Sequence, residues 1–199
     1  MCLPGDVREA NAEQGPVLAK VADVIQATLD AWAGHGLRAL IVSGGSSPSA
    51  MQSAQIKQLT EIRPGTYIYN DMNQVAGERC ALDDVAARFV CTVVSDAVEG
   101  KCVLDAGSKT LTMDRIFKNP EGGGFGHVVE CPEAKIVRLS EEHGEVDLSR
   151  CSTRPKLGDR VTVIPNHICP AVNLHDFAWL RDGTDELIRL PIDARGKTT

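Results

Sequence analysis

Short β-rich segments follow one another through the second half of the sequence, and they constrain the fold more than any other feature. They are rich in Val, Ile, Thr and Phe, and turn signals such as Glu99-Gly100 and Asp182-Gly183 separate them. Short strands at this spacing predict an antiparallel barrel or sandwich. The predicted strands are residues 87–95, 101–104, 135–139, 145–148, 160–165 and 178–181.

The first part of the chain has a different pattern. Residues 16–32 carry apolar side chains at helical spacing, and residues 37–42 form an apolar run typical of a strand covered on both faces. A Gly/Ser loop, a short helix over 49–58 and a strand-like segment over 61–69 follow. Helix, strand, loop, helix and strand in this order predict an α/β arrangement.

The change of pattern places a domain boundary between residues 72 and 84. We assign residues 1–76 to the α/β part and residues 77–199 to the β-domain. Acidic residues outnumber basic ones by 27 to 21, which gives a net charge of −6. Nucleic acids and anionic membranes bind basic surfaces, so the sequence predicts neither as a partner. No apolar run approaches the roughly 20 residues of a membrane span.

The cysteines are scattered and contain no CxxC pair, which indicates reduced thiols and not a disulfide framework. The first six residues lack the basic start and the apolar stretch of a signal peptide. Both observations predict a cytoplasmic protein. The seven cysteines are Cys2, Cys80, Cys91, Cys102, Cys131, Cys151 and Cys169.

Two loops that follow the predicted α/β strands are candidates for anion binding. Glycine lets backbone N–H groups approach a phosphate closely, and hydroxyl groups and a following helix N-terminus add donors. Each loop taken alone is also compatible with a plain turn that needs glycine for its backbone angles. The candidate residues are Ser43, Gly44, Gly45 and Ser46 in the first loop, and Arg63, Gly65 and Thr66 in the second.

The segment over 165–176 concentrates polar groups between two prolines. In a strand His167 and Cys169 would point to the same face, and imidazole with thiolate suits Zn²⁺. Two protein ligands leave open positions for water and substrate. His175 and Asp176 are candidates for additional or supporting ligands. The alternative is a buried cysteine beside a hydrogen-bonded histidine, which is commoner for any two such residues.

Five strings resemble one family, the D-threonine aldolases and D-serine dehydratases. They run in order between about residues 35 and 182, and the HxCPxxNLHD and DAGxK patterns are the most specific of them. The family has an alanine-racemase-type fold, a TIM barrel that binds pyridoxal phosphate followed by a β-domain. The resemblance implies an α/β plus β chain, with the C-terminal part of a TIM barrel before an antiparallel β-barrel or sandwich. The strings are VSGGSSPS, TEIRPGTYIYND, VLDAGSKTLTMDR, LSEEHG and PNHICPAVNLHD.

The resemblance also implies roles for the candidate residues. The loop over 43–46 matches the one that holds the cofactor phosphate, and Gly65 and Thr66 match the second phosphate loop. Arg63 lies where alanine racemases place an arginine against the pyridine nitrogen. His167 and Cys169 match the pair that binds Zn²⁺, Mn²⁺ or Mg²⁺. Many D-threonine aldolases have Asp as the second ligand, so the cysteine favours a dehydratase-like member.

The implied activity is that of a lyase acting on D-3-hydroxy amino acids. Pyridoxal phosphate provides the electron sink and the metal polarises the β-hydroxyl. The substrates of the family are D-serine, D-3-hydroxyaspartate and D-threonine, and the complete enzyme is a homodimer.

The lysine that forms the Schiff base lies early in the family's barrel, and neither Lys20 nor Lys57 matches it. No catalytic residue is therefore assigned, and the chain is expected to be inactive alone. The alternatives are a metal-binding or dimerisation module and a non-functional remnant.

Overall fold

The computed structural model describes residue 7 and residues 11–184 and 186–197. The chain forms two compact units, one made of Met1–Asn70 and Gln74–Asp84, the other of Asp71–Asn73 and Val85–Thr199. The predicted boundary at residue 76 lies within the Gln74–Asp84 segment of the first unit. Cys2 and the leader segment considered above lie outside the described residues. No helix in the described ranges is both long and apolar enough to cross a bilayer.

The first unit is built on helix α1 (Gly15–Gly34), which confirms the helix predicted over 16–32. Its buried residues Leu18 and Ile25 pack with Ile56 in a small core. Gly36 has a φ of 73°, and this left-handed residue ends the helix. The remaining elements are η1 (Asn11–Glu13), β1 (Ser43–Gly44), η2 (Ser47–Gln55), β2 (Glu61–Ile62), η3 (Thr66–Ile68) and η4 (Leu82–Asp84). Helix α2 (Met72–Ala76) begins in the second unit and ends in the first.

The strand predicted over 37–42 is wrong. The pairing begins only at Ser43, and Leu40 and Ile41 are 79% and 68% exposed. Strand β1 pairs in parallel with β2, and these two strands form a sheet by themselves. The apolar run is therefore not buried between neighbouring strands and helices. The strand predicted over 61–69 is also shorter, because Pro64 cannot donate to a ladder and η3 follows it.

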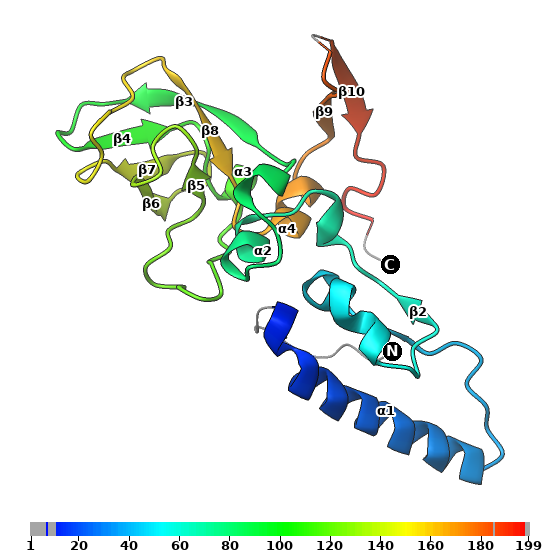
Figure 1. The fold of residues 1–199 in the computed structure, drawn as a ribbon. Coiled ribbons are helices and arrows are strands. Elements are labelled where there is room, and N and C mark those ends of the chain that lie inside the picture. The colour runs from blue at the N-terminus through cyan, green and yellow to red at the C-terminus, as the bar shows by residue number, and fades with distance from the viewer. Residues whose placement is uncertain (1–6, 8–10, 185, 198–199) are drawn as a thin grey trace. The chain divides into compact units, whose positions relative to one another are not determined.

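The second unit contains a six-stranded antiparallel sheet with the order β5-β8-β3-β4-β7-β6 (Figure 1). Its two edges approach each other where the Phe125 N–H donates to the carbonyl of Ile136 at 3.1 Å. The sheet therefore nearly closes, which confirms the predicted antiparallel barrel. The strands are β3 (Phe89–Ser95), β4 (Lys101–Leu104), β5 (His127–Val128), β6 (Lys135–Leu139), β7 (Gly144–Asp147) and β8 (Arg160–Ile164).

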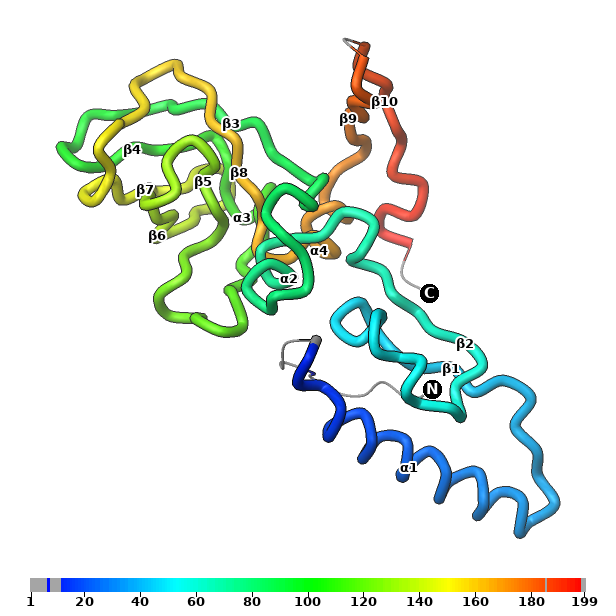
Figure 2. Tube along the Cα trace, in the orientation of Figure 1, coloured from blue at the N-terminus to red at the C-terminus, as the bar shows by residue number. Residues whose placement is uncertain are grey.

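Two short helices and a hairpin complete this unit. Helix α3 (Ser108–Leu111) follows β4, and α4 (Ile168–Asn173) follows β8. The tube in Figure 2 leaves the barrel after α4 and ends in the antiparallel hairpin of β9 (Phe177–Arg181) and β10 (Leu187–Pro191). Strand β9 matches the prediction over 178–181, whereas β10 was not predicted.

The barrel core consists of the inward-pointing side chains of alternating strand positions. Ile136 and Val163 are fully buried, and neighbouring Val137 is 36% exposed. Replacing Ile136 with alanine is expected to lower the free energy of unfolding by about 3 kcal/mol, because a buried cavity is left behind. Urea denaturation measures the change, with Val137→Ala as the control on the same strand. An equal loss in both variants would contradict this core assignment.

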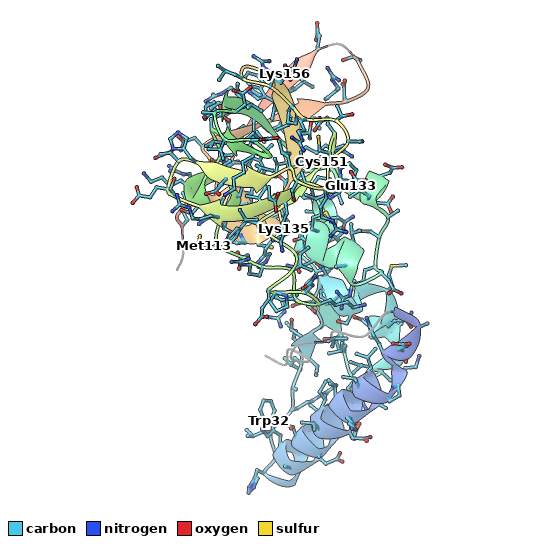
Figure 3. The ribbon with its side chains drawn as sticks, turned by 90° about the vertical axis from the view of Figure 1, so that its left-hand side faces the viewer. Trp32, Met113, Glu133, Lys135, Cys151 and Lys156 are labelled. Atoms are coloured by element: carbon cyan, nitrogen blue, oxygen red, sulfur yellow. The ribbon has the colours of Figure 1, made fainter. Side chains whose placement is uncertain are left out.

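Four thiols lie in the same core, those of Cys91, Cys102, Cys131 and Cys151. Burial raises the pKa of Cys91 to about 12 and that of Cys102 to about 11. Burial is also the main cause that raises the pKa of Cys151, and the nearby Glu133 carboxylate adds to it (Figure 3). None of the six cysteines in the described part of the chain forms a disulfide.

These raised pKa values predict alkaline destabilisation. The unfolded thiols lose their protons near pH 9, while Cys91 and Cys102 in the folded state stay protonated to higher pH. The folded state then binds more protons, so the free energy of unfolding falls as pH rises above about 9. Urea unfolding between pH 8 and 11 measures the slope, and the slope should be shallower in Cys91→Ala. Equal slopes would contradict the burial of this thiol.

Candidate metal and phosphate sites

The segment with His167 and Cys169 begins helix α4 and does not continue strand β8, so the predicted strand geometry is wrong. His167 is the residue before the helix and has an extended backbone, with φ −139° and ψ 109°. Pro170 suits the first turn of a helix. The carboxylate of Asp71 accepts the N–H of Ile168 at 3.0 Å and so satisfies one of the free donors of that turn.

The side chains of His167 and Cys169 meet in spite of the different backbone. A hydrogen bond between them is the main cause that raises the pKa of His167. Burial acts in the opposite direction, and the carboxylates of Asp114 and Asp71 raise the pKa further. The thiol side chain is exposed, and that of His167 is 34% exposed. The pair is thus joined and accessible, as two ligands of a catalytic metal need to be.

Asp114 is a neighbour of His167 that the sequence patterns did not single out. One of its carboxylate oxygens, Oδ2, lies 3.6 Å from Nδ1 of the imidazole. Its only sequence signal is its place at the end of the string VLDAGSKTLTMDR.

His175 and Asp176 have partners other than the predicted pair. Nδ1 of His175 lies 2.8 Å from the carbonyl of Ala171, and its ring stacks at 5.0 Å on Phe89. Asp176 forms an ion pair of 2.6 Å with Arg195. Within the described ranges no group of three or more His, Cys, Asp or Glu side chains could hold a metal.

The two candidate phosphate loops are neighbours in the first unit. Ser43 pairs with Glu61 in the parallel ladder, so both loops leave the same edge of the small sheet. The hydroxyl of Ser47 ties them together by accepting the N–H groups of Gly65 at 3.1 Å and Tyr67 at 3.2 Å. The hydroxyl of Ser43 donates to the Glu61 carboxylate.

Arg63 is the residue of these loops that most needs an anionic ligand. Its Nε and one terminal nitrogen are buried, and neither has a hydrogen-bond partner among the described residues. A buried charge without a partner is costly, so a phosphate or carboxylate nearby would stabilise it. Gly45 has a φ of 73°, and a Cβ there would lie 3.1 Å from the Ser53 hydroxyl oxygen. The positive φ and this close approach both favour glycine at position 45.

Two of the five strings, DAGSK and LSEEHG, pack against each other at the barrel. Ser108 and Lys109 donate their N–H groups to the carbonyls of Ser140 and Glu141, at 2.9 and 3.1 Å. The Lys109 ammonium lies 3.0 Å from the Glu141 carboxylate and 2.7 Å from that of Glu142. Lys109 is 57% exposed, so it is a surface charge and not part of a pocket.

The chain is similar to several known proteins. Residues 86–180 match the model of the putative serine dehydratase domain. D-threo-3-hydroxyaspartate dehydratase of Delftia sp. (strain HT23) is 31% identical over 150 residues, which cover 67% of this chain and 39% of that enzyme. The chain belongs to the D-threonine aldolase and D-serine dehydratase family.

Two further relatives show what share of a related protein's length this chain covers. The crystal structure of D-threonine aldolase from Filomicrobium marinum superimposes with a TM-score of 0.77 at 28% identity, covering 97% of this chain and 51% of that one. An uncharacterized protein of Mycobacterium tuberculosis (strain ATCC 25618 / H37Rv) is 40% identical over 132 residues, 64% of this chain and 96% of the relative. The chain spans 39% and 51% of the length of the two enzymes but 96% of the mycobacterial protein.

Proposed function

We propose that this chain carries the metal-binding and phosphate-binding parts of a lyase that depends on pyridoxal phosphate and a divalent metal. Its substrates are D-3-hydroxy amino acids, as in the related hydroxyaspartate dehydratase and D-threonine aldolase. Residues 1–76 are the C-terminal part of the TIM barrel in this proposal. The observation that carries it is the hydrogen-bonded, accessible pair of His167 and Cys169.

The metal site is the better supported half of this proposal. Imidazole nitrogen and thiolate sulfur are ligands that Zn²⁺ prefers, while Mn²⁺ and Mg²⁺ prefer oxygen. The metal, when bound, supplies a Lewis acid for the substrate hydroxyl group. A solved structure of a D-threo-3-hydroxyaspartate dehydratase is a cysteine-to-alanine variant in the metal-free form. The cysteine at position 169 also favours the dehydratase type over the aldolase type.

The phosphate half rests on the two adjoining loops and on Arg63. The unpartnered guanidinium nitrogens would bind an anionic part of the cofactor, and Gly45, Ser46, Gly65 and Thr66 would form the phosphate cradle. Ser43 and Gly65 contribute less, since the Ser43 hydroxyl already donates to Glu61 and the Gly65 N–H already donates to the Ser47 hydroxyl. Pyridoxal phosphate supplies the electron sink when it is bound.

The chain alone is proposed to lack lyase activity. Neither lysine considered as a covalent anchor lies in the two loops, because Lys20 is on the exposed side of α1 and Lys57 follows η2. Purified chain mixed with pyridoxal phosphate should show no visible absorbance band that borohydride removes, and no product from D-serine. Such a band, or turnover, would contradict this part of the proposal.

A metal-binding or dimerisation module is the second candidate. The mycobacterial relative favours it, because 132 residues account for 96% of that protein. Zinc analysis and light scattering on the purified chain distinguish the two. Stoichiometric zinc together with measurable pyridoxal phosphate binding supports the lyase part, whereas a zinc-containing dimer that does not bind the cofactor supports the module. A homodimer is proposed for the complete enzyme in either case.

A further inference from the structure

The surroundings of His167 contain a carboxylate that belongs to none of the predicted sites. Oδ2 of Asp114 lies 3.6 Å from Nδ1 of the imidazole, and both side chains are partly exposed, at 41% and 34%. Metal-binding histidines usually direct one ring nitrogen to a carboxylate or carbonyl, which fixes the ring and its tautomer for the metal at the other nitrogen. With the carboxylate at Nδ1, Nε2 is left for the metal.

We infer that Asp114 is a positioning residue that orients His167 for metal binding. The inference rests on the proposed metal site, and it adds a residue that does not itself bind the metal. A third protein ligand is not indicated, since the described residues form no group of three acidic, histidine or cysteine side chains that could hold a metal.

The position of Asp114 is fixed from three directions. The hydroxyl of Thr112 donates to the same carboxylate oxygen, Oδ2, at 2.8 Å. The N–H of Asp114 donates back to the Thr112 hydroxyl oxygen at 3.2 Å. The side-chain amide of Asn166, a fully buried residue, donates to the Asp114 carbonyl at 3.0 Å. Asn166 immediately precedes His167, so the same residue links the backbone of Asp114 to that of His167.

The backbone of Thr112 supports a constrained arrangement. Its φ is 66°, in the left-handed region that a β-branched residue rarely adopts. Such strain persists only where the surrounding structure holds it, and it clusters at functional sites. Here the strained residue ends helix α3 and supplies the hydroxyl that holds Asp114.

The other carboxylates near this segment have different contacts. Asp71, whose charge also reaches His167, accepts the N–H of Ile168 at the start of α4. Asp176 pairs with Arg195. Among the described residues, Asp114 is therefore the one whose carboxylate oxygen lies beside Nδ1 of His167.

The test is the affinity of the full chain for Zn²⁺, measured by isothermal titration calorimetry. Removing a residue that supports a metal ligand typically lowers the affinity for the metal by about 10- to 100-fold. The loss of zinc affinity in Asp114→Ala should fall in this range, and the loss in Asp114→Asn should be about tenfold. Asp176→Asn, the same chemical change on a carboxylate paired elsewhere, should bind zinc as the wild type does. Circular dichroism establishes that each variant is folded.

A second pair of variants tests the inference without touching the carboxylate. Thr112→Ser keeps the hydroxyl and should retain zinc affinity, whereas Thr112→Val removes it and should weaken binding, though less than Asp114→Ala. Wild-type affinity in Asp114→Asn would overturn the positioning role while leaving the proposed metal site intact. If the wild-type chain itself bound no zinc, both the inference and the proposed metal site would fail.

Discussion

Replacing His167 with alanine is expected to weaken Zn²⁺ binding by about 100-fold, the largest effect on binding that the structure predicts. The proposed site has two ligands among the described residues, His167 and Cys169, so this variant keeps one of them. Structural zinc held by four ligands has an apparent binding free energy of about 10–16 kcal/mol, and an equal share for each ligand corresponds to a change of about two orders of magnitude. Competition with a chromophoric zinc chelator measures the affinity.

The control for this prediction is His35→Ala. His35 is an exposed histidine that follows helix α1 in the other unit, so its loss should leave zinc affinity unchanged. Equal weakening in both variants would mean that zinc binds surface histidines nonspecifically, and unchanged affinity in His167→Ala would remove the metal assignment.

Cys169→Asp tests what the second ligand contributes. Carboxylate suits Mn²⁺ and Mg²⁺ better than thiolate does, and the exposed side chain at this position leaves room for the change. The ratio of Mn²⁺ to Zn²⁺ affinity should therefore rise relative to the wild type. An unchanged ratio would show that position 169 does not contact the metal.

Gly107→Ala is expected to have the largest effect on stability, about 3 kcal/mol or more. A Cβ at this position would lie 2.4 Å from the carbonyl oxygen of Glu141 and 2.5 Å from that of Ser140. Both are backbone atoms, so the clash cannot be relieved by rotating a side chain, and overpacking of this kind costs about 1–3 kcal/mol even where neighbours can adjust. Urea denaturation measures the loss.

Gly100→Ala separates this clash from the general effect of losing a glycine. Gly100 has a φ of 73° with open space around it, so its replacement costs only the left-handed backbone term of about 1–2 kcal/mol. A loss in Gly107→Ala no greater than that in Gly100→Ala would contradict the close packing of the DAGSK and LSEEHG strings.

The alternation of apolar residues predicted most of the barrel. Strands β4 and β6 have the predicted bounds, because each is a short apolar segment between clear turn signals. Strand β5 was missed since its two residues, His127 and Val128, are too few to show a period. The apolar run over 37–42 was wrongly predicted to be a strand. Apolar side chains indicate burial, but a strand also needs neighbouring strands to pair with, and residues 37–42 have none among the described residues.

The sequence predicted from residue types that His167 and Cys169 meet, but it did not predict their local structure. His167 and Cys169 are two apart in sequence, which suits a shared strand face, but Pro170 and the carboxylate of Asp71 allow a helix to start there instead. Asp114 could not be predicted, because the fold brings it to His167 from a distant part of the sequence. Thr112, whose hydroxyl holds the Asp114 carboxylate, has a left-handed backbone, and a threonine in the sequence does not predict that conformation.

The absorption spectrum of the chain titrated with Co²⁺ tests the central claim most directly. Cobalt takes the place of zinc at tetrahedral sites, and a thiolate ligand gives it a charge-transfer band in the near ultraviolet. We predict that this band appears, saturates at one cobalt per chain and is lost in Cys169→Ser, while Cys80→Ser retains it. A spectrum without the band, or a band that survives in Cys169→Ser, would contradict a metal site at His167 and Cys169.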